Sequence, residues 1–119
     1  MTQIAYSKVL ENFGISNKIY YNFCMNINKI NKSYYQLERI IKGVSNHRRI
    51  EILELLKKKP ELSLTDISEI LNVNFKTISE HIKRLAIAGF ILKRYEGHSV
   101  RHKLTDRGLV ILKFLRTLE

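Results

Sequence analysis

The sequence predicts a mainly α-helical domain with one β-hairpin, an α+β fold, and three observations support this prediction. Apolar residues recur at three- and four-residue steps through most of the chain, which is the period of an amphipathic helix. The period changes to two after Gly89, over a stretch long enough for two short strands. The chain has 119 residues, 45% hydrophobic and 27% charged, which is the composition of a single globular domain.

The charge of the chain points to a polyanionic partner. Lys and Arg together number 21 against 11 Asp and Glu, so the formal net charge is +10 and the pI is about 9.9. A globular domain this basic binds nucleic acid more often than an anionic membrane. The apolar runs are too short for a signal peptide or a membrane span, and the single cysteine, Cys24, excludes an intrachain disulfide. We therefore expect a cytoplasmic protein that does not bind a membrane.

A first helix is expected to end at Pro60. Ser45 and Asn46 are residue types that cap helix starts, and Lys57, Lys58 and Lys59 suit the negative C-terminal end of the helix. Its wide apolar stripe consists of Ile50, Ile52, Leu53, Leu55 and Leu56.

Two more helices, separated by a short break, are expected between Ser63 and Gly89. Ser63 and Asp66 form a capping-box pattern at the start of the first, and Asn72 tolerates the positive φ that ends it. Asn74 can cap the next helix, which Gly89 ends. The apolar face of the first is expected to consist of Ile67, Ile70 and Leu71. The core-facing positions of the second are Ile78, Ile82 and Leu85.

Two strands and a last helix complete the pattern. Residues 90–95 and 99–104 are expected to pair around Glu96-Gly97-His98, where Gly97 supplies the positive φ of a tight hairpin. Thr105 and Asp106 then cap a helix whose apolar side consists of Ile111, Leu115 and Leu118.

This order, with a tight turn between the second and third helices, is the winged helix-turn-helix plan. In that plan the third helix enters the DNA major groove. Lys can donate to guanine and Asn can pair with adenine, while Ser and Thr can hydrogen-bond to either base edge. Glu80 could accept from cytosine or simply pair with Lys83 or Arg84. Basic residues around the hairpin would touch the DNA backbone or minor groove. The candidate DNA-binding residues are Asn74, Phe75, Lys76, Thr77, Ser79, Glu80, Lys83, Arg84, Lys93, Arg94, His98 and Arg101.

Several motifs together carry a resemblance to a family. They are SNHRRIEILELL, the T-x-S-x-H-I-x-x-L core of the third helix, the A-G-F exit and the E-G turn of the hairpin. Residues 33–118 resemble the ArsR-type (arsenic-repressor-like) winged-helix regulators through these motifs. The resemblance implies a dimeric repressor that releases DNA when it senses a signal. The L-T-D-R-G segment is also similar to the MarR-type family, which shares the same DNA-reading plan.

One departure from the family concerns metal. Metal-sensing ArsR-type proteins carry Cys-x-Cys within ELCVCDL, whereas the matching positions in ELSLTDI are Ser63 and Thr65. A hydroxyl is a poor replacement for thiolate at a soft-metal site. The family's other common metal site uses His and acids on the last helix, which here has Asp106 but no His. We therefore expect no metal site and no cofactor.

The remaining reactive side chains favour structural roles. His98 and His102 flank the hairpin and are expected to form a cationic wing tip rather than a ligand pair. His81 is expected to pack or cap, and Cys24 to be a small buried hydrophobe, with a redox switch as the alternative. The sequence has no Gly-rich phosphate loop, no convincing Ser-His-Asp set and no paired carboxylates in an apolar setting. We expect no catalytic function.

The N-terminal segment predicts a dimer interface. Residues at alternating three- and four-residue steps form a heptad seam: Tyr20, Phe23, Ile27, Ile30, Tyr34, Leu37, Ile41 and Val44. A capping pattern at Ser33 and Gln36 leaves open whether this segment is one helix or two. We expect residues 1–42 and 105–119 to dimerise and residues 43–104 to bind DNA; the alternative is an intrachain cap over the core. The expected dimer residues are Phe23, Ile27, Ile30, Tyr34, Leu37, Ile41, Ile111, Leu115 and Leu118.

These observations predict a homodimeric repressor that binds a palindromic double-stranded DNA operator. Two alternatives stay open. A winged helix can serve as a protein–protein module, for which Glu80 and an exposed Ile87 are better suited than for DNA. The other alternative is a sensor of a small ligand or of redox state, with the Tyr-rich N-terminal segment forming its pocket.

Overall fold

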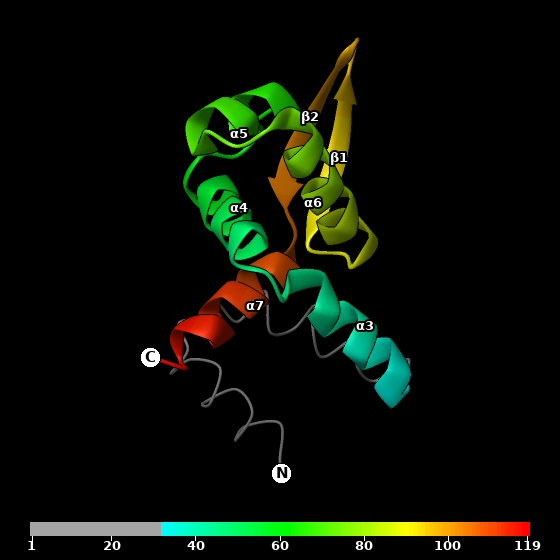
Figure 1. Ribbon diagram of the computed structural model, residues 1–119. Coiled ribbons are helices and arrows are strands. Elements are labelled where there is room, and N and C mark those ends of the chain that lie inside the picture. Colours follow the sequence, from blue (N-terminus) through cyan, green and yellow to red (C-terminus); the bar gives the residue numbers. More distant parts are fainter. Residues whose placement is uncertain (1–31) are drawn as a thin grey trace.

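The computed structural model describes residues 32–119. Figure 1 shows four helices and a hairpin in the predicted order, preceded by one further helix. The elements are α3 (Tyr34–Val44), α4 (His47–Lys58), α5 (Leu64–Leu71), α6 (Phe75–Ile87), β1 (Ile91–Glu96), β2 (Ser99–Leu104) and α7 (Asp106–Arg116). The hairpin projects from the helical body at the end opposite to α3 and α7. Cys24 and the seam positions Tyr20, Phe23, Ile27 and Ile30 lie outside the described residues.

The predicted caps start and stop the helices. Asn46 Oδ1 accepts from the backbone N–H groups of Arg48 and Arg49, and Asn74 Oδ1 accepts from that of Lys76 at 2.8 Å. Ser63 and Asp66 form the reciprocal capping box of α5. Asn72 adopts φ 51°, which turns the chain between α5 and α6. The tight turn of the helix-turn-helix therefore follows from side chains near each helix end.

The core lies where α4, α5, α6 and the start of β1 meet. Its fully buried members are Ile52, Leu53, Leu56, Ile67, Ile78, Ile82, Leu85 and Phe90. Val44 from α3 and Leu112 from α7 are buried in the same cluster, so both outer helices are fixed to the domain. The prediction for α5 was wrong at Ile70, which is exposed, whereas Leu71 in the same turn packs against the core.

The hairpin has the register that its turn requires. Residues pair from Ile91 opposite Leu104 to Glu96 opposite Ser99, which leaves a two-residue loop. Gly97 in that loop has φ 59°, in the left-handed region that glycine adopts at little cost. β1 begins and ends one residue later than predicted, and Phe90, just before it, is buried in the core. An isolated bridge from Leu62 to His102 joins the base of the hairpin to the segment before α5.

The last helix packs on the core through Leu112, next to the side that was expected to dimerise. Leu112 is its buried apolar side chain, Ile111 packs partly against the core, and Leu118 lies beyond the helix and is exposed. The start of α7 is held by Thr105, which caps Gly108 and donates to the carbonyl of Gly89 at 2.6 Å. A Cβ at Gly108 would lie 2.6 Å from the Phe90 carbonyl oxygen, so this helix approaches the chain closely.

Helix α3 begins at the capping box that the sequence contained. The Ser33 hydroxyl accepts from the Gln36 backbone, and the Gln36 side chain accepts from that of Ser33. Helix α3 thus starts at Tyr34, and the earlier part of the seam lies outside the described residues. The seam residues Tyr34, Leu37 and Ile41 are exposed, whereas Val44 is buried. No helix among residues 32–119 is long and apolar enough to cross a membrane.

Candidate nucleic-acid interface

Helix α6 separates an apolar face from a polar one. Ile78, Ile82 and Leu85 are buried as predicted. The opposite face is exposed and carries Lys76, Thr77, Ser79, Glu80, Lys83 and Arg84. Glu80 accepts from Arg84 Nε at 3.2 Å, the pairing that the i, i+4 spacing allowed. The N-terminal half of the face has no such ion pair among the described residues and presents amide, hydroxyl and ammonium groups.

The start of α6 is fixed against α5. The Ser68 hydroxyl donates to the Val73 carbonyl at 2.7 Å, and the Val73 N–H donates back to the Ser68 carbonyl. The side-chain oxygen of Asn74 accepts the hydrogen bond that caps the helix, so its amide N–H groups remain available to an outside partner. Phe75 follows in the first turn and is half exposed. The helix N-terminus therefore points outward with a defined orientation.

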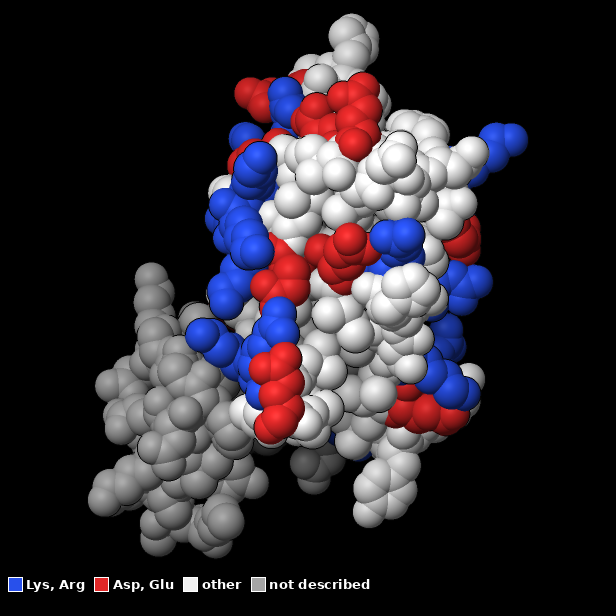
Figure 2. Space-filling model, turned by 60° about the vertical axis from the view of Figure 1, so that its left-hand side comes forward, with Lys and Arg blue, Asp and Glu red and all other residues white. Residues whose placement is uncertain are grey.

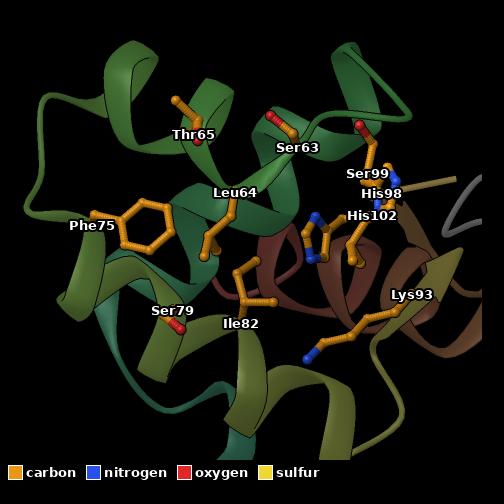
Figure 3. A pocket seen from close by; sticks show the side chains of 11 residues that line it. Ser63, Leu64, Thr65, Phe75, Ser79, Ile82, Lys93, His98, Ser99 and His102 are labelled. Atoms are coloured by element: carbon orange, nitrogen blue, oxygen red, sulfur yellow. The ribbon is translucent and has the colours of Figure 1, made fainter. Parts of the chain in front are cut away.

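A cavity of about 410 Å³ lies between α5, α6 and the hairpin. Figure 3 shows the Lys93 side chain extending from β1 toward α6, with Ser79 and Ile82 on the α6 side. Hydroxyl and cationic groups surround it: Ser63, Thr65, Ser79, Lys93, His98 and Ser99. These are the side chains that commonly bind phosphate oxygens. The cavity brings together four of the predicted DNA-binding residues, Phe75 and Ser79 from α6, Lys93 from β1 and His98 from the hairpin turn.

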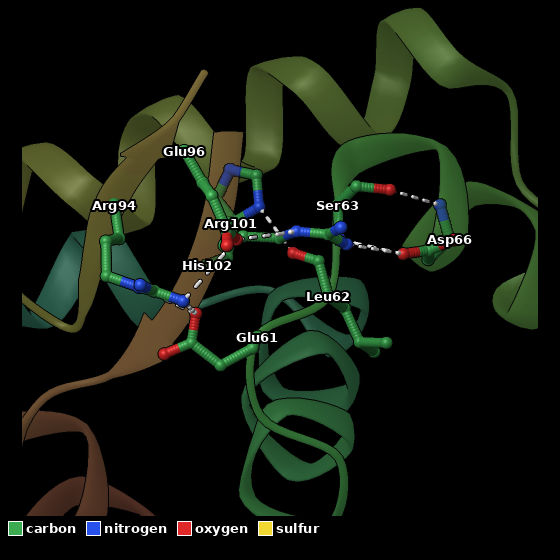
Figure 4. A network of polar contacts seen from close by, with 8 residues as sticks. All are labelled: Glu61, Leu62, Ser63, Asp66, Arg94, Glu96, Arg101 and His102. Carbon is green, nitrogen blue, oxygen red and sulfur yellow. Dashed lines mark hydrogen bonds and ion pairs between the residues drawn. The ribbon is translucent and has the colours of Figure 1, made fainter. Parts of the chain in front are cut away.

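A network of ion pairs fastens the hairpin (hereafter the wing) to the start of α5 (Figure 4). Arg94 donates from Nε and Nη2 to Glu61 Oε2 at 3.0 and 2.8 Å, and this pairing raises the pKa of Arg94. Arg101 lies 3.6 Å from Asp66 Oδ2 and 3.8 Å from Glu96 Oε2. Arg94 and Arg101 are thus already paired within the protein.

His102 is a correction to the sequence prediction. Its side chain is 2% exposed at the base of the wing and is no part of a cationic wing tip. Its ring Nδ1 lies 2.9 Å from the Leu62 carbonyl oxygen, which also accepts the His102 backbone N–H. Burial lowers the pKa of His102, and nearby Lys93 adds to this effect. A neutral imidazole therefore locks the wing to the chain before α5, while His98 is exposed at the turn.

His81 packs as expected but without the hydrogen bond of a capping residue. It is partly buried on the side of α6, and its Nδ1 has no hydrogen-bond partner among the described residues. Burial, followed by the charges of Arg49 and Arg84, lowers the pKa of His81.

Charge is unevenly distributed around the molecule. Figure 2 shows the side that carries α4 and α5, where Lys and Arg line two opposite edges and acidic side chains lie between them. This side mixes both signs, whereas the exposed N-terminal half of α6 offers Lys76 with no acidic partner among the described residues. The α6 face is the better surface for a polyanion.

Residues 46–93 match the model of a known family, described as bacterial regulatory proteins of the arsR family. The matched segment runs from the cap of α4 into β1, so it includes both helices of the helix-turn-helix. Over this segment, which is less than half of the chain, the sequence is similar to the arsR family. Bacterial regulatory proteins of that description are the class that the sequence motifs resembled.

Solved structures share the fold of this winged helix-turn-helix unit. HlyU from Vibrio cholerae superposes with a TM-score of 0.62 at 26% identity, over 75% of this chain and 97% of HlyU. An ArsR-like transcriptional regulator from Rhodococcus sp. RHA1 gives 0.58 at 25% identity, over 71% and 77% of the two chains. A homodimeric winged helix-turn-helix DNA-binding domain from Mycobacterium bovis gives 0.64 at 22% identity, over 75% and 88%, and at that identity shows the fold alone.

A relative by sequence is an uncharacterized protein of Methanocaldococcus jannaschii. It is 33% identical over 60 residues, which make up 50% of this chain. The matched region spans only 22% of the relative, so the two proteins share one unit rather than a whole architecture.

The position that matches the arsR-type Cys-x-Cys motif has a structural role in this chain. Ser63 is the N-cap of α5, and its hydroxyl accepts from the Asp66 N–H at 3.1 Å. The Asp66 carboxylate accepts from the Ser63 N–H at 3.0 Å, and this bond lowers the pKa of Asp66. Thr65 is exposed in the first turn. Within residues 32–119, no three His, Cys, Asp or Glu side chains converge as metal ligands would.

Proposed function

We propose that this protein is a homodimeric transcriptional repressor that binds a palindromic double-stranded DNA operator through α6 and the wing. One observation carries the proposal: the N-terminal half of α6 exposes amide, hydroxyl and ammonium groups, while its opposite face is fully buried. In helix-turn-helix complexes the N-terminal residues of the recognition helix contact base edges. Asn74, Lys76 and Thr77 occupy that position here.

We assign different tasks to the twelve candidate DNA-binding residues. Base contacts fall to the exposed polar face of α6, with Phe75 available for apolar contact with a thymine methyl group. The cavity beside Lys93 and His98 accommodates a backbone phosphate. Arg94 and Arg101 orient the wing through their carboxylate partners and add positive charge beside the duplex. The base-contacting residues are Asn74, Lys76, Thr77, Ser79, Glu80, Lys83 and Arg84.

The proposed dimer interface uses the apolar side chains that the single chain leaves exposed. On α3 these include Tyr34, Leu37 and Ile41, and Leu118 lies just past α7. An exposed apolar surface of this kind on a small domain marks an interaction site. The Mycobacterium bovis domain of the same fold is homodimeric. We therefore propose that residues 1–42 and 105–119 dimerise, with Ile111 and Leu115 at the edge of the interface, and that residues 43–104 contact DNA.

In-vitro selection from a random duplex library at near-physiological salt tests the function. Enrichment of a two-fold symmetric site, with half-sites about one helical turn apart, is the expected result. Binding that only fades smoothly as salt rises, with no enriched sequence, would leave charge attraction alone and contradict the proposal. Sedimentation tests the dimer, and a monomer at micromolar concentration would remove that part.

A matched pair of variants tests the assignment of α6. Lys76→Ala with Lys83→Ala is expected to weaken operator binding by about tenfold or more without lowering the Tm, because both side chains are exposed. Lys58→Ala with Lys59→Ala removes the same charge at the end of α4 and serves as the control. Equal losses in the two double variants would mean that net charge, and not this face, determines binding.

A further inference from the structure

A second cavity lies between α3 and the C-terminal half of α6, and it shares Glu80, Lys83 and Arg84 with the proposed DNA-contacting face. Its volume is about 460 Å³, within the usual size range of small-molecule sites. Five basic side chains and one acidic side chain line it: Arg39, Lys42, Arg49, Lys83, Arg84 and Glu80. Helix α6 rises by about 1.5 Å per residue, so Ile87 in this cavity lies roughly 16 Å along the helix from Lys76.

The carboxylates within reach do not balance these cations. Arg84 pairs with Glu80, and Lys42 pairs with Glu38 on α3. Arg49 reaches past the end of α3 and donates from Nη1 to the carbonyls of Lys42 and Gly43 at 3.0 and 2.8 Å. No carboxylate pairs with Arg49 among the described residues, so the cavity retains an excess of positive charge.

Two buried polar atoms at this junction lack partners. They are Arg49 Nε and His81 Nδ1, the only buried side-chain nitrogen or oxygen atoms in residues 32–119 without a hydrogen bond. Burial and the neighbouring charge of Arg84 lower the pKa of Arg49. A buried N–H donor without an acceptor costs free energy, so Arg49 Nε adds an unfavourable polar atom next to the cavity. An anion in the cavity would supply the negative charge that the Arg49 guanidinium lacks.

The rest of the lining is apolar. Ile40, Ile87 and Ala88 face the same cavity, and the Ile87 side chain is 71% exposed. The floor is formed where Gly43 meets Ala88, since a Cβ at Gly43 would lie 2.4 Å from Ala88 Cβ. The cavity thus combines cationic groups that bind oxyanions with an exposed hydrophobic side chain.

We propose that this cavity binds a small organic anion, whose carboxylate or phosphate group contacts Arg49 and Arg84 and whose apolar body covers Ile87. Guanidinium groups bind both oxyanions through paired N–H donors. The ligand would contact α3 and α6 together, so it would couple the proposed dimer helix to the proposed DNA-reading helix. That coupling rests on the proposed function, whereas the binding site does not.

The binding test uses the full chain without DNA. Butyl phosphate is the probe, inorganic phosphate tests the head group, and butanol at equal ionic strength tests the apolar part alone. Arginine Nε–Hε signals in NMR spectra report on Arg49 and Arg84 directly. We expect saturable shifts of these signals with butyl phosphate, weaker binding of phosphate and none of butanol. Shifts that sodium chloride reproduces at the same ionic strength would overturn the proposal.

A pair of charge-matched variants locates the site. Arg84→Gln is expected to weaken butyl phosphate binding about fivefold or more, because it removes one of the two contacting guanidinium groups. Lys59→Gln carries the same charge change at the far end of α4 and is expected to bind as the wild type does. Both side chains are exposed, so folding is retained. Equal binding by Arg84→Gln and wild type would place the anion elsewhere and overturn the assignment.

A final arm separates a free anion from a DNA phosphate in this cavity. Butyl phosphate is titrated in the presence of saturating duplex DNA. Persisting Arg49 and Arg84 shifts would show that both ligands bind together and that Arg84 contacts the anion rather than DNA. An apparent Kd that rises in proportion to the DNA concentration would identify the cavity as a site for the DNA backbone and overturn the proposal. If the protein fails to bind DNA, the result for butyl phosphate binding to the free protein still stands.

Discussion

Two junctions flank helix α6, and they balance charge in opposite ways. On the wing side, Arg94 pairs with Glu61, and Arg101 lies beside Asp66 and Glu96. On the α3 side, five cations surround one cavity with a single carboxylate in its lining. Both unpartnered buried polar atoms in residues 32–119 occur at that junction or next to it.

The difference indicates what each junction does. Hydrogen-bonded ion pairs that leave no polar group unsatisfied fix one geometry, which suits a wing that must stay beside a recognition helix. Unbalanced cations repel one another, so the α3 junction is the place where an added anion changes the energy of the fold. The structure therefore combines a fixed scaffold on one side of α6 with a ligand-sensitive contact on the other.

The largest expected loss of stability comes from a substitution that disrupts the α3 junction sterically. Gly43→Ala places a Cβ 2.4 Å from Ala88 Cβ, so α3 and α6 must separate, at a cost of about 2 kcal/mol in the free energy of unfolding. Gly97→Ala is the comparison in the wing, where no atom lies within 4 Å of the new methyl and only the positive φ of 59° costs about 1 kcal/mol. Urea unfolding measures both, and a smaller loss for Gly43→Ala would contradict the close packing of α3 on α6.

A pH-dependent effect tests the wing junction. The folded pKa of His102 lies below its ordinary value, so the unfolded chain takes up a proton first as the pH falls. Stability is then full above the ordinary histidine pKa of about 6.5. It is lost between that pH and the lower folded pKa, by at most about 1.4 kcal/mol per pH unit for one group.

Replacing the imidazole isolates its share of that loss. His102→Gln is expected to flatten the fall in unfolding free energy between pH 7 and 5, measured by denaturant titration at each pH. His81 has a pKa lowered in the same direction, so part of the slope remains, and His81→Gln is the matched variant at the other junction. Asp66 acts at more acidic pH, because its pKa is lowered from the ordinary carboxyl range. An unchanged slope in His102→Gln would mean that His102 does not stay neutral in the folded protein.

Local signals account for what the sequence predicted well. Each cap lies within three residues of the N–H groups it binds, as at Asn74 and Ser63, so its chemistry is readable without the fold. The buried face of α6 follows from helical spacing, and the Gly97 turn follows from its need for positive φ. The exposed face of α6 was therefore predicted together with its core face.

Contacts between distant segments account for what the sequence missed. The acceptor for His102 is the carbonyl of Leu62, forty residues away. Glu61, which pairs with Arg94, has a backbone φ of 65° that the sequence did not indicate. Alternation along a strand indicates which side a residue takes, but not which segment covers that side. Arg49 gave no sequence signal either, since its role depends on the end of α3 lying against it. A helix rotation of about 100° per residue separates Ile111, which was expected at the dimer interface, from the core residue Leu112.

The smallest expected effect compares one arginine from each junction. Arg94→Gln leaves Glu61 without its bidentate partner and is expected to lower the Tm. Arg84→Gln removes an exposed i, i+4 pair with Glu80 but also relieves repulsion with Arg49, so its Tm is expected to stay within about 3 °C of wild type. Arg48→Gln breaks an ordinary surface ion pair with Glu51, and its change in Tm is the reference for the other two variants. A larger loss for Arg84→Gln than for Arg94→Gln would reverse the comparison, because the α3 junction would then be the balanced one.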